Sequence, residues 1–306
     1  MGMFQKNHGK NLKVLQLLAL PALAALAVTG MSQSSQAALV ASDNAGNYAT
    51  DGWTAAGAKN LGTGFGGWTF SPNPASNGGS AGAFLADTTT LNGQTPPIAT
   101  SGDSWGVYAN NGSGNSNINI TRGFLPGVGS SATVGTLRDG QTFSIALASA
   151  GISNSNAAFG FNLQGSGGTN TPFILKYQSG GADAMTLIDA AGGHSIGVDF
   201  ADLSAGINVS FTLGGTVANG NQDYSLAINS ISGSTLATYS GQVSGDLNQF
   251  EIFDTNTQGN GYFNSIAVAG TPIVPTPLPA TVGLVLAGGI GLAGMRMKRR
   301  YRNIRP

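Results

Sequence analysis

The chain has 306 residues, of which 48 are glycine and none is cysteine. The lack of cysteine excludes a disulfide-linked scaffold, a thiolate metal site and a cysteine nucleophile. Only 8% of the residues are charged, against roughly a quarter in an ordinary soluble domain, while the apolar fraction of 41% suffices for a core. This composition excludes a disordered polyelectrolyte and a coiled coil.

The formal net charge of zero conceals a separation of charges along the chain. All 13 acidic residues lie between Asp43 and Asp254, where only four basic residues accompany them, so this central part has a net charge of −9. The other basic residues lie at the two ends, beside apolar runs. Basic residues next to apolar runs are typical of membrane targeting, and the negative central part argues against nucleic acid as a partner.

The N-terminal segment has the three parts of a secretory signal peptide. Residues 1–13 are basic and polar, residues 14–28 are almost wholly apolar, and Ser35-Gln36-Ala37 is a small-x-small site. This order predicts a signal helix within residues 1–37, bound by the secretion translocon and cleaved after Ala37 by signal peptidase. An uncleaved anchor helix is the alternative interpretation.

The C-terminal segment, residues 272–306, also has three parts. Four prolines between residues 272 and 279 break any helix, and residues 280–295 contain no charge. The uncharged run predicts a membrane helix slightly shorter than the ~20 residues that a permanent span prefers. The basic cluster behind it would stop transfer and stay on the cytoplasmic side. Its residues are Arg296, Lys298, Arg299, Arg300 and Arg302.

This C-terminal segment resembles the PEP-CTERM sorting signal, a short proline-containing motif followed by an apolar span and an arginine cluster. The motif residues here are Val274, Pro275, Pro277, Leu278, Pro279 and Ala280. The Pro-Glu-Pro of the family is not intact, and the segment is similar to a VPLPA-type variant of it. The resemblance implies that an exosortase-like membrane enzyme processes an inner-membrane-anchored precursor near the motif. A plain tail anchor is the alternative.

The central residues 38–271 alternate between apolar and polar residues, which is the pattern of half-buried β-strands. Such runs are Phe143–Leu147, Phe159–Leu163, Phe173–Tyr177, Ile207–Leu213, Tyr224–Ile228 and Tyr262–Val268. In the last run we expect Tyr262, Ile266 and Val268 to share one face. Glycine-rich and asparagine-rich segments separate the runs, and no amphipathic helix is evident. We expect twelve to fourteen strands in a single large all-β sandwich or jelly roll, with residues 41–135 supplying edge strands and long loops.

The order of these segments resembles the concanavalin A-like sandwich of many secreted bacterial proteins. The similar parts are Ser104–Tyr108, Asp139–Ser144, Gly160–Leu163 and Gly261–Ile266. That fold includes lectins, glycanases and structural modules, so it does not by itself select a function.

The acidic residues argue against a glycosidase, which needs two carboxyl groups at a defined separation. Residues three apart in a strand point to opposite faces, so Glu251 and Asp254 cannot act on one substrate. His194 could join Asp189 or Asp199 in a catalytic triad, but no Gly-x-Ser-x-Gly motif accompanies it. We therefore predict no catalytic residue and no enzymatic activity.

A calcium ion is the one cofactor that the sequence suggests. Asp254, Asn256 and Gln258 place oxygen-bearing side chains at positions one, three and five of a loop, as in a calcium-binding loop, and position twelve is Ser265 instead of glutamate. A hairpin turn between strands at 247–253 and 262–268 explains the same residues.

Trp105 and Tyr108 are candidates for stacking against a sugar, although burial in the core is the commoner use of such residues. The leading interpretation is an exported non-enzymatic protein, sorted to the cell surface or extracellular matrix, where its low charge suits a polysaccharide. A lectin-like carbohydrate-binding module is the alternative, and a glycan hydrolase is a disfavoured third.

Overall fold

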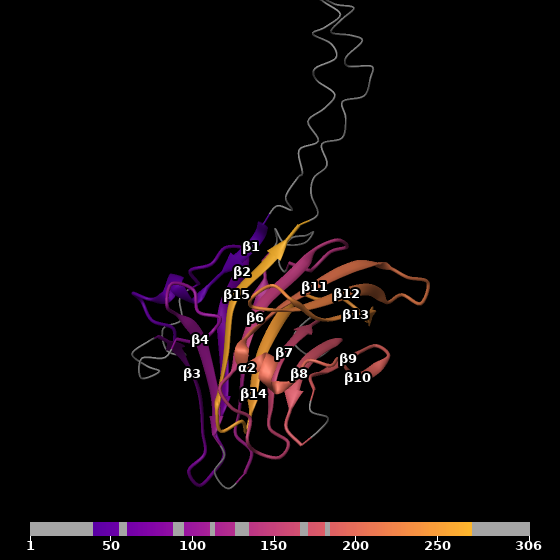
Figure 1. Ribbon diagram of the computed structural model, residues 1–306. Coiled ribbons are helices and arrows are strands. Elements are labelled where there is room, and N and C mark those ends of the chain that lie inside the picture. Colours follow the sequence, from indigo (N-terminus) through magenta and orange to yellow (C-terminus); the bar gives the residue numbers. More distant parts are fainter. Residues whose placement is uncertain are drawn as a thin grey trace, which may run out of the picture. The chain divides into compact units, whose positions relative to one another are not determined.

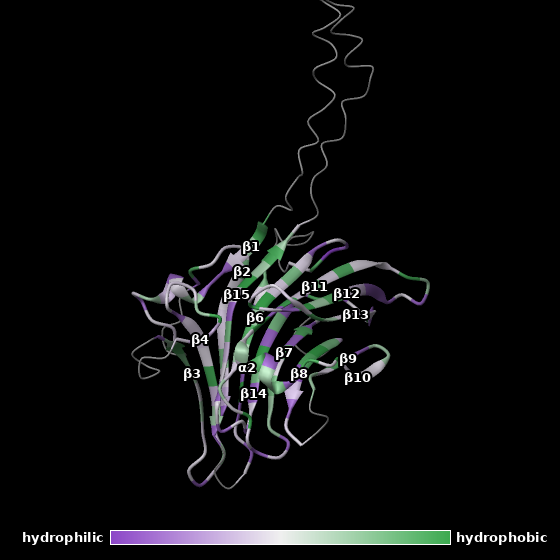
Figure 2. Ribbon diagram, in the orientation of Figure 1, coloured by the Kyte–Doolittle hydropathy of each residue, from purple (hydrophilic) through white to green (hydrophobic). Residues whose placement is uncertain are grey.

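Alternating apolar residues build a β-sandwich from two antiparallel sheets (Figure 1). Hydrophobic and hydrophilic residues alternate along many of the strands, as Figure 2 shows. The computed structural model describes residues 39–54, 60–87, 95–110, 114–125, 135–165, 171–180 and 184–270.

The first sheet has eight strands in the order β13-β12-β11-β6-β15-β4-β3, with β1 paired to β15 beside this path. Its strands are β1 (Leu39–Asp43), β3 (Ser80–Ala86), β4 (Ser104–Asn110), β6 (Thr142–Ser149), β11 (Ile207–Thr216), β12 (Gln222–Ser230), β13 (Thr235–Val243) and β15 (Asn260–Ala269). The first half of β15 pairs with β4 and the second half with β1, so the first and last described strands lie side by side (Figure 1).

The second sheet has seven strands in the order β10-β9-β8-β7-β14-β5-β2. Its strands are β2 (Phe65–Asn73), β5 (Asn117–Phe124), β7 (Ala158–Gln164), β8 (Phe173–Gln178), β9 (Thr186–Asp189), β10 (Gly192–Ser195) and β14 (Gln249–Thr255). A 3₁₀ helix, η1 (Ala45–Tyr48), and a short helix, α2 (Phe200–Ala205), lie in the connections.

The core lies between the two sheets. Phe143 of β6 contacts Phe161 of β7 and Phe250 of β14, with ring centroids 5.8 and 5.3 Å apart. All three side chains are fully buried, and burial of each contributes roughly 1.5–3 kcal/mol. The sandwich is therefore held by aromatic and aliphatic residues from the inward positions of both sheets.

The predicted β-sandwich is confirmed, but the described residues contain fifteen strands, one more than the upper end of the expected twelve to fourteen. Residues 41–135 supply the edge strands β2 and β3 as expected, but also β4 and β5, which lie inside the first and the second sheet. The helix α2 was not expected. It begins with a capping box in which the Asp199 carboxylate accepts from the amide of Asp202, and the Asp202 carboxylate accepts from that of Asp199.

The last strand departs from the predicted alternation because it contains a β-bulge. Ser265 has a positive φ of 51°, and the register with β6 shifts between Asn264 and Ala267. The extra residue places Phe263 on the inward face together with Ile266, while Tyr262 packs on the outward face against Phe84. The prediction that Tyr262 and Ile266 share a face is therefore wrong.

The predicted hairpin turn after β14 is also wrong, because β14 and β15 belong to different sheets. The residues between them carry the chain from one sheet to the other. Asn256 and Gln258 both have positive φ angles, 52° and 55°, in this crossing segment.

The predicted signal helix, sorting motif and membrane helix lie outside the described residues. Within the part of the chain that the structure describes, no helix is long and apolar enough to cross a membrane.

Candidate functional site

The outward face of the seven-stranded sheet carries polar side chains in register across its central strands. Phe250 and Ile252 of β14 point into the core, so Glu251 between them points outward. Glu251 lies directly opposite Asn162 of β7 on one side and Thr121 of β5 on the other. Every outward residue on β5, β7 and β14 is buried or half-buried, so these side chains shield one another from water.

Side-chain amides surround the Glu251 carboxylate. Asn162 donates from Nδ2 to Glu251 Oε1 at 2.8 Å. Gln164 also hydrogen-bonds Glu251 and accepts from Nε2 of Gln249 at 2.5 Å. The result is a row of amides, Asn162, Gln164 and Gln249, that holds one carboxylate in place.

Burial raises the pKa of Glu251, and the hydrogen bonds from Asn162 and Gln164 lower it by a smaller amount. None of the ion pairs within the described residues involves this carboxylate. A half-buried carboxylate without a cation is a strong acceptor for hydroxyl donors of a ligand.

Asn162 has an acceptor that nothing in the described chain uses. The residue is 8% exposed, and its Oδ1 atom is buried without a hydrogen-bond partner among the described residues. A buried acceptor without a donor costs about 1–3 kcal/mol. Because Phe161 and Leu163 point inward, this oxygen lies on the outward side, beside Glu251.

An aromatic ring and a closely packed glycine lie next to these polar groups. Phe253 is half-buried and points outward on β14, opposite Gly160 of β7, which in turn lies opposite Lys176 of β8. Gly160 is required here because an added Cβ would lie 2.1 Å from the carbonyl oxygen of Leu175. Gly160 is itself buried and closely packed against β8, between the Phe253 ring and Lys176, which lie about 10 Å apart across two strand spacings.

The structure places Trp105 in the core and not on a surface. The side chain is fully buried, and its ring packs against Trp68 at 5.1 Å and Phe263 at 5.2 Å. Stacking against a sugar would require an exposed indole, which Trp105 lacks. Tyr108 is half-buried, with its ring 6.1 Å from Phe84, and it is not near Trp105's ring cluster.

Two of the three side chains of the candidate calcium loop are engaged in contacts within the chain. Asp254 is fully buried and accepts from Thr257 Oγ1 with both carboxylate oxygens, at 2.8 and 2.9 Å. Asn256 Oδ1 accepts from the amide of Ser116 at 2.7 Å, and Gln258 is exposed. The described residues contain no cluster of three or more acidic or histidine side chains that could hold a metal ion.

His194 and Asp189 do meet, as the triad alternative required. Nε2 of His194 lies 3.3 Å from Asp189 Oδ1, and the Tyr224 hydroxyl donates to Asp189 Oδ2 at 2.7 Å. The His194 ring also packs against Tyr239, at 5.0 Å. No serine hydroxyl is among the hydrogen-bond partners of His194 in the described chain. These contacts connect β9 and β10 to the edge of the other sheet, which is a structural role.

The sequence offered no signal that would bring Glu251, Asn162 and Phe253 together with Gly160 and Lys176. Asn162 and Glu251 are 89 residues apart in the chain, and only strand pairing makes them neighbours. The predicted sorting residues, basic cluster and cleavage site at Ala37 lie outside the described residues.

No protein-family model matches the chain, and no curated protein sequence matches it. Several solved structures are similar at low sequence identity. The T. cruzi calreticulin globular domain has a TM-score of 0.43 at 10% identity, over 77% of this chain and 95% of that chain. The alginate lyase from Corynebacterium sp. has a TM-score of 0.38 at 11% identity, over 66% of this chain and 93% of that chain. A legume lectin-like domain from Entamoeba histolytica has a TM-score of 0.36 at 10% identity, over 58% of this chain and 88% of that chain. These values are too low to transfer an activity.

Proposed function

We propose that the protein is an exported, non-enzymatic surface or extracellular-matrix protein that binds a neutral polysaccharide through the outward face around Glu251. The single observation that carries the binding proposal is the half-buried Glu251 carboxylate, which points outward without a cation partner among the described residues and is held in place by Asn162 and Gln164. This carboxylate is an acceptor, and sugar hydroxyls are donors that can pair with it.

The remaining groups of the face suit a sugar. The half-buried Phe253 ring, two residues from Glu251 on the same face of β14, offers a surface for stacking. Among the described outward residues of this sheet, Glu251 and Lys176 are the charged ones. A polyanion would call for several cations, so the balance of one acid and one base favours a neutral polysaccharide.

The absence of enzymatic activity is part of the proposal. Glu251 supplies the one carboxylate among the described outward residues of the seven-stranded sheet, while Asp254 points to the core. A two-carboxylate hydrolysis would need a second acid on the same face. The concanavalin A-like resemblance of the segment order is compatible with a lectin-like module without a catalytic pair.

Export and sorting rest on the sequence. The predicted signal peptide would direct secretion, and the motif from Val274 to Ala280 would be processed by an exosortase-like enzyme. The intact mass of protein taken from its native envelope and medium tests this. A chain ending between Pro275 and Ala280 supports sorting, whereas a mass from Ala38 to Pro306 overturns it and leaves a membrane-anchored sandwich.

The binding proposal is tested by calorimetry with hexasaccharides of β-glucan, mannan and galactan, and with alginate as an acidic comparison. We expect one neutral series to bind and the Asn162→Ala and Glu251→Gln variants to bind it at least tenfold more weakly. Thr238→Ala, an exposed position on β13 of the other sheet, is the matched control. Binding that is unchanged in Asn162→Ala, with circular dichroism showing an intact fold, would overturn the proposal.

A further inference from the structure

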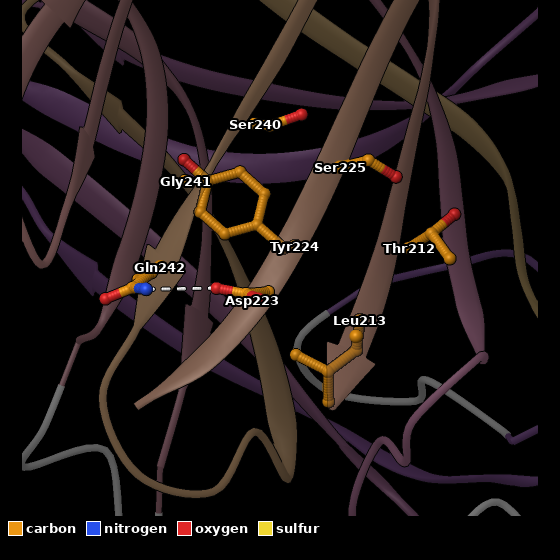
Figure 3. Close-up of a pocket in the computed structure, with 9 residues that line it drawn as sticks. Thr212, Leu213, Asp223, Tyr224, Ser225, Ser240, Gly241 and Gln242 are labelled. Carbon is orange, nitrogen blue, oxygen red and sulfur yellow. Dashed lines mark hydrogen bonds between the residues drawn. The ribbon is translucent and has the colours of Figure 1, made fainter. Parts of the chain in front are cut away.

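A hollow lies over β11, β12 and β13, on the other sheet of the sandwich. Its volume is about 580 Å³ (Figure 3). The residues that line it are Thr212, Leu213, Gly214, Asp223, Tyr224, Ser225, Ser240, Gly241 and Gln242. Leu213 and Tyr224 are buried and point toward the core, so the residues on either side of them face outward.

One wall of the hollow is a row of hydroxyl groups. Thr212, Ser225 and Ser240 lie directly opposite one another on the three strands. Thr142 continues the row onto β6, with its Oγ1 atom 2.8 Å from that of Thr212. Hydroxyl groups both donate and accept, so such a row can pair with the hydroxyl groups of a sugar in either direction.

The opposite wall holds a carboxylate that two amides keep in position. Gln242 Nε2 donates to Asp223 Oδ1 at 3.0 Å, and Asn219 Nδ2 donates to Gln242 Oε1 at 3.0 Å. Figure 3 shows the Asp223–Gln242 pair below the hydroxyl row. Asp223 is exposed, which leaves its second oxygen accessible to a ligand.

The distance between the hydroxyl row and the Asp223–Gln242 pair suits one sugar ring. Asp223 and Gln242 are two residues away from Ser225 and Ser240 along their strands, which corresponds to about 7 Å. Gly214 adds no side chain beside Asp223. Gly241 is fixed as glycine from the other side of the sheet, since an added Cβ would lie 2.2 Å from Asp189 Oδ2 and 2.7 Å from the Tyr224 hydroxyl.

We propose that this hollow is a second carbohydrate site, which takes a neutral sugar unit through the hydroxyl row and the Asp223–Gln242 pair. The outward faces of a sandwich point in opposite directions, so the two sites of one chain lie on opposite sides. One chain then joins two polysaccharide strands. The cross-linking rests on the proposed function of the Glu251 face, whereas binding in the hollow does not.

Calorimetry with the neutral hexasaccharide that binds most tightly measures the number of sites per chain. We expect two sites in the wild-type protein, one in Asp223→Ala, one in Asn162→Ala and none in the double variant. Asp223→Ala alters an exposed side chain and is not expected to affect folding. Thr238→Ala, an exposed position on β13 outside the hollow, is the matched control and should keep both sites.

The outcomes separate the two proposals. One site that Asn162→Ala abolishes and Asp223→Ala leaves intact overturns the hollow and keeps the Glu251 face. One site with the opposite response keeps the hollow and overturns the Glu251 face. In a second readout, beads coated with the polysaccharide should agglutinate with the wild-type protein and fail to do so with either single variant. Agglutination by Asp223→Ala at the wild-type concentration would contradict the cross-linking role.

Discussion

Asp254 shows how one acidic side chain on the core face of a strand makes the stability of the fold depend on pH. Its neighbours in register are Ile118 and Phe159, both buried. Burial raises the pKa of Asp254 from 3.8 to about 7, against smaller opposing effects of hydrogen bonds from Thr257 and Gly261. The folded state therefore holds this proton more tightly than the unfolded state does. The contribution of this group to the stability of the fold therefore falls as the pH rises from about 4 to about 7. Above that range the contribution no longer changes with pH.

The variant Asp254→Asn should remove this pH dependence. Relative to the variant, the free energy of unfolding of the wild-type protein should fall by up to about 4 kcal/mol between pH 4 and pH 8, as one pKa unit corresponds to about 1.4 kcal/mol. Urea unfolding of both proteins across that range measures the difference. Parallel pH curves for the two proteins would contradict the assignment.

The alternation of apolar and polar residues along the sequence predicted on which face of a strand some side chains lie. Glu251 and Asp254 do point to opposite faces, because the periodicity of a strand needs only neighbouring residues. The pairing of Glu251 with Asn162 could not be predicted, since it depends on which strands become neighbours. The same holds for Trp105, whose aromatic character suited both a core and a sugar platform until its burial was known.

At the scale of elements, a buried ion pair ties β1 and η1 to the inner face of β5. Arg122 Nη1 lies 2.6 Å from Asp43 Oδ2, and both side chains are fully buried. The Tyr48 hydroxyl of η1 donates to the same carboxylate oxygen at 2.7 Å. The guanidinium also lies over the Trp68 ring, 4.4 Å from its centroid. These contacts join residues that lie far apart in the chain.

Replacement of Arg122 by methionine should destabilise the fold strongly. The substitution keeps most of the volume but leaves the Asp43 carboxylate buried without a cation, which typically costs about 3–5 kcal/mol. Chemical unfolding at pH 7 measures the loss. Arg138→Ala, at an exposed position, is the control and should change stability by less than ~0.5 kcal/mol. Equal stability of the two variants would mean that the Arg122–Asp43 pair does not hold β1 to β5.

The bulge in β15 explains why the strands were easier to predict than their faces. Periodicity identifies a strand, but one inserted residue at positive φ reverses the alternation beyond it. The crossing from β14 to β15 was missed for a related reason, since sheet membership is set by contacts across the whole sandwich. Likewise, helix α2 has six residues, too few for a helical periodicity to be visible.

Substitutions at Ser265 test the bulge. Because a side chain at φ 51° is strained, Ser265→Gly should stabilise the protein by up to about 1 kcal/mol, and Ser265→Val should destabilise it by about 1–2 kcal/mol. Ser265→Ala keeps the strain and removes the hydroxyl contact with Thr100, so it separates the two effects. The midpoints of thermal unfolding give the order of stability of the three variants and the wild-type protein. A valine variant as stable as the glycine variant would contradict a left-handed residue at this position.

At the scale of the whole molecule, the sequence predicted a large β-sandwich but not its strand order. Apolar alternation demands two facing sheets, whereas the order depends on pairings between distant segments. The pairing of β1 with β15 is the longest of these, with Leu39 opposite Ala269. The predicted cleavage after Ala37 would leave β1 intact, with Ala38 as the one residue before it, so export and folding would be compatible.

Truncation at the start of the exported chain tests how much β1 contributes to the whole sandwich. A chain from Ala38 to Ile273 keeps the strand, while a chain from Asn44 to Ile273 loses its pairing with β15 and also Asp43, the partner of Arg122. We expect the midpoint of thermal unfolding to fall by about 10 °C, since an uncompensated buried charge costs about 3–5 kcal/mol and each kcal/mol shifts the midpoint by about 2–4 °C in a domain of this size. The variant Asp43→Ala in the longer chain separates the lost charge from the lost strand. A shorter chain that unfolds at the same temperature as Asp43→Ala would show that the strand pairing itself adds nothing.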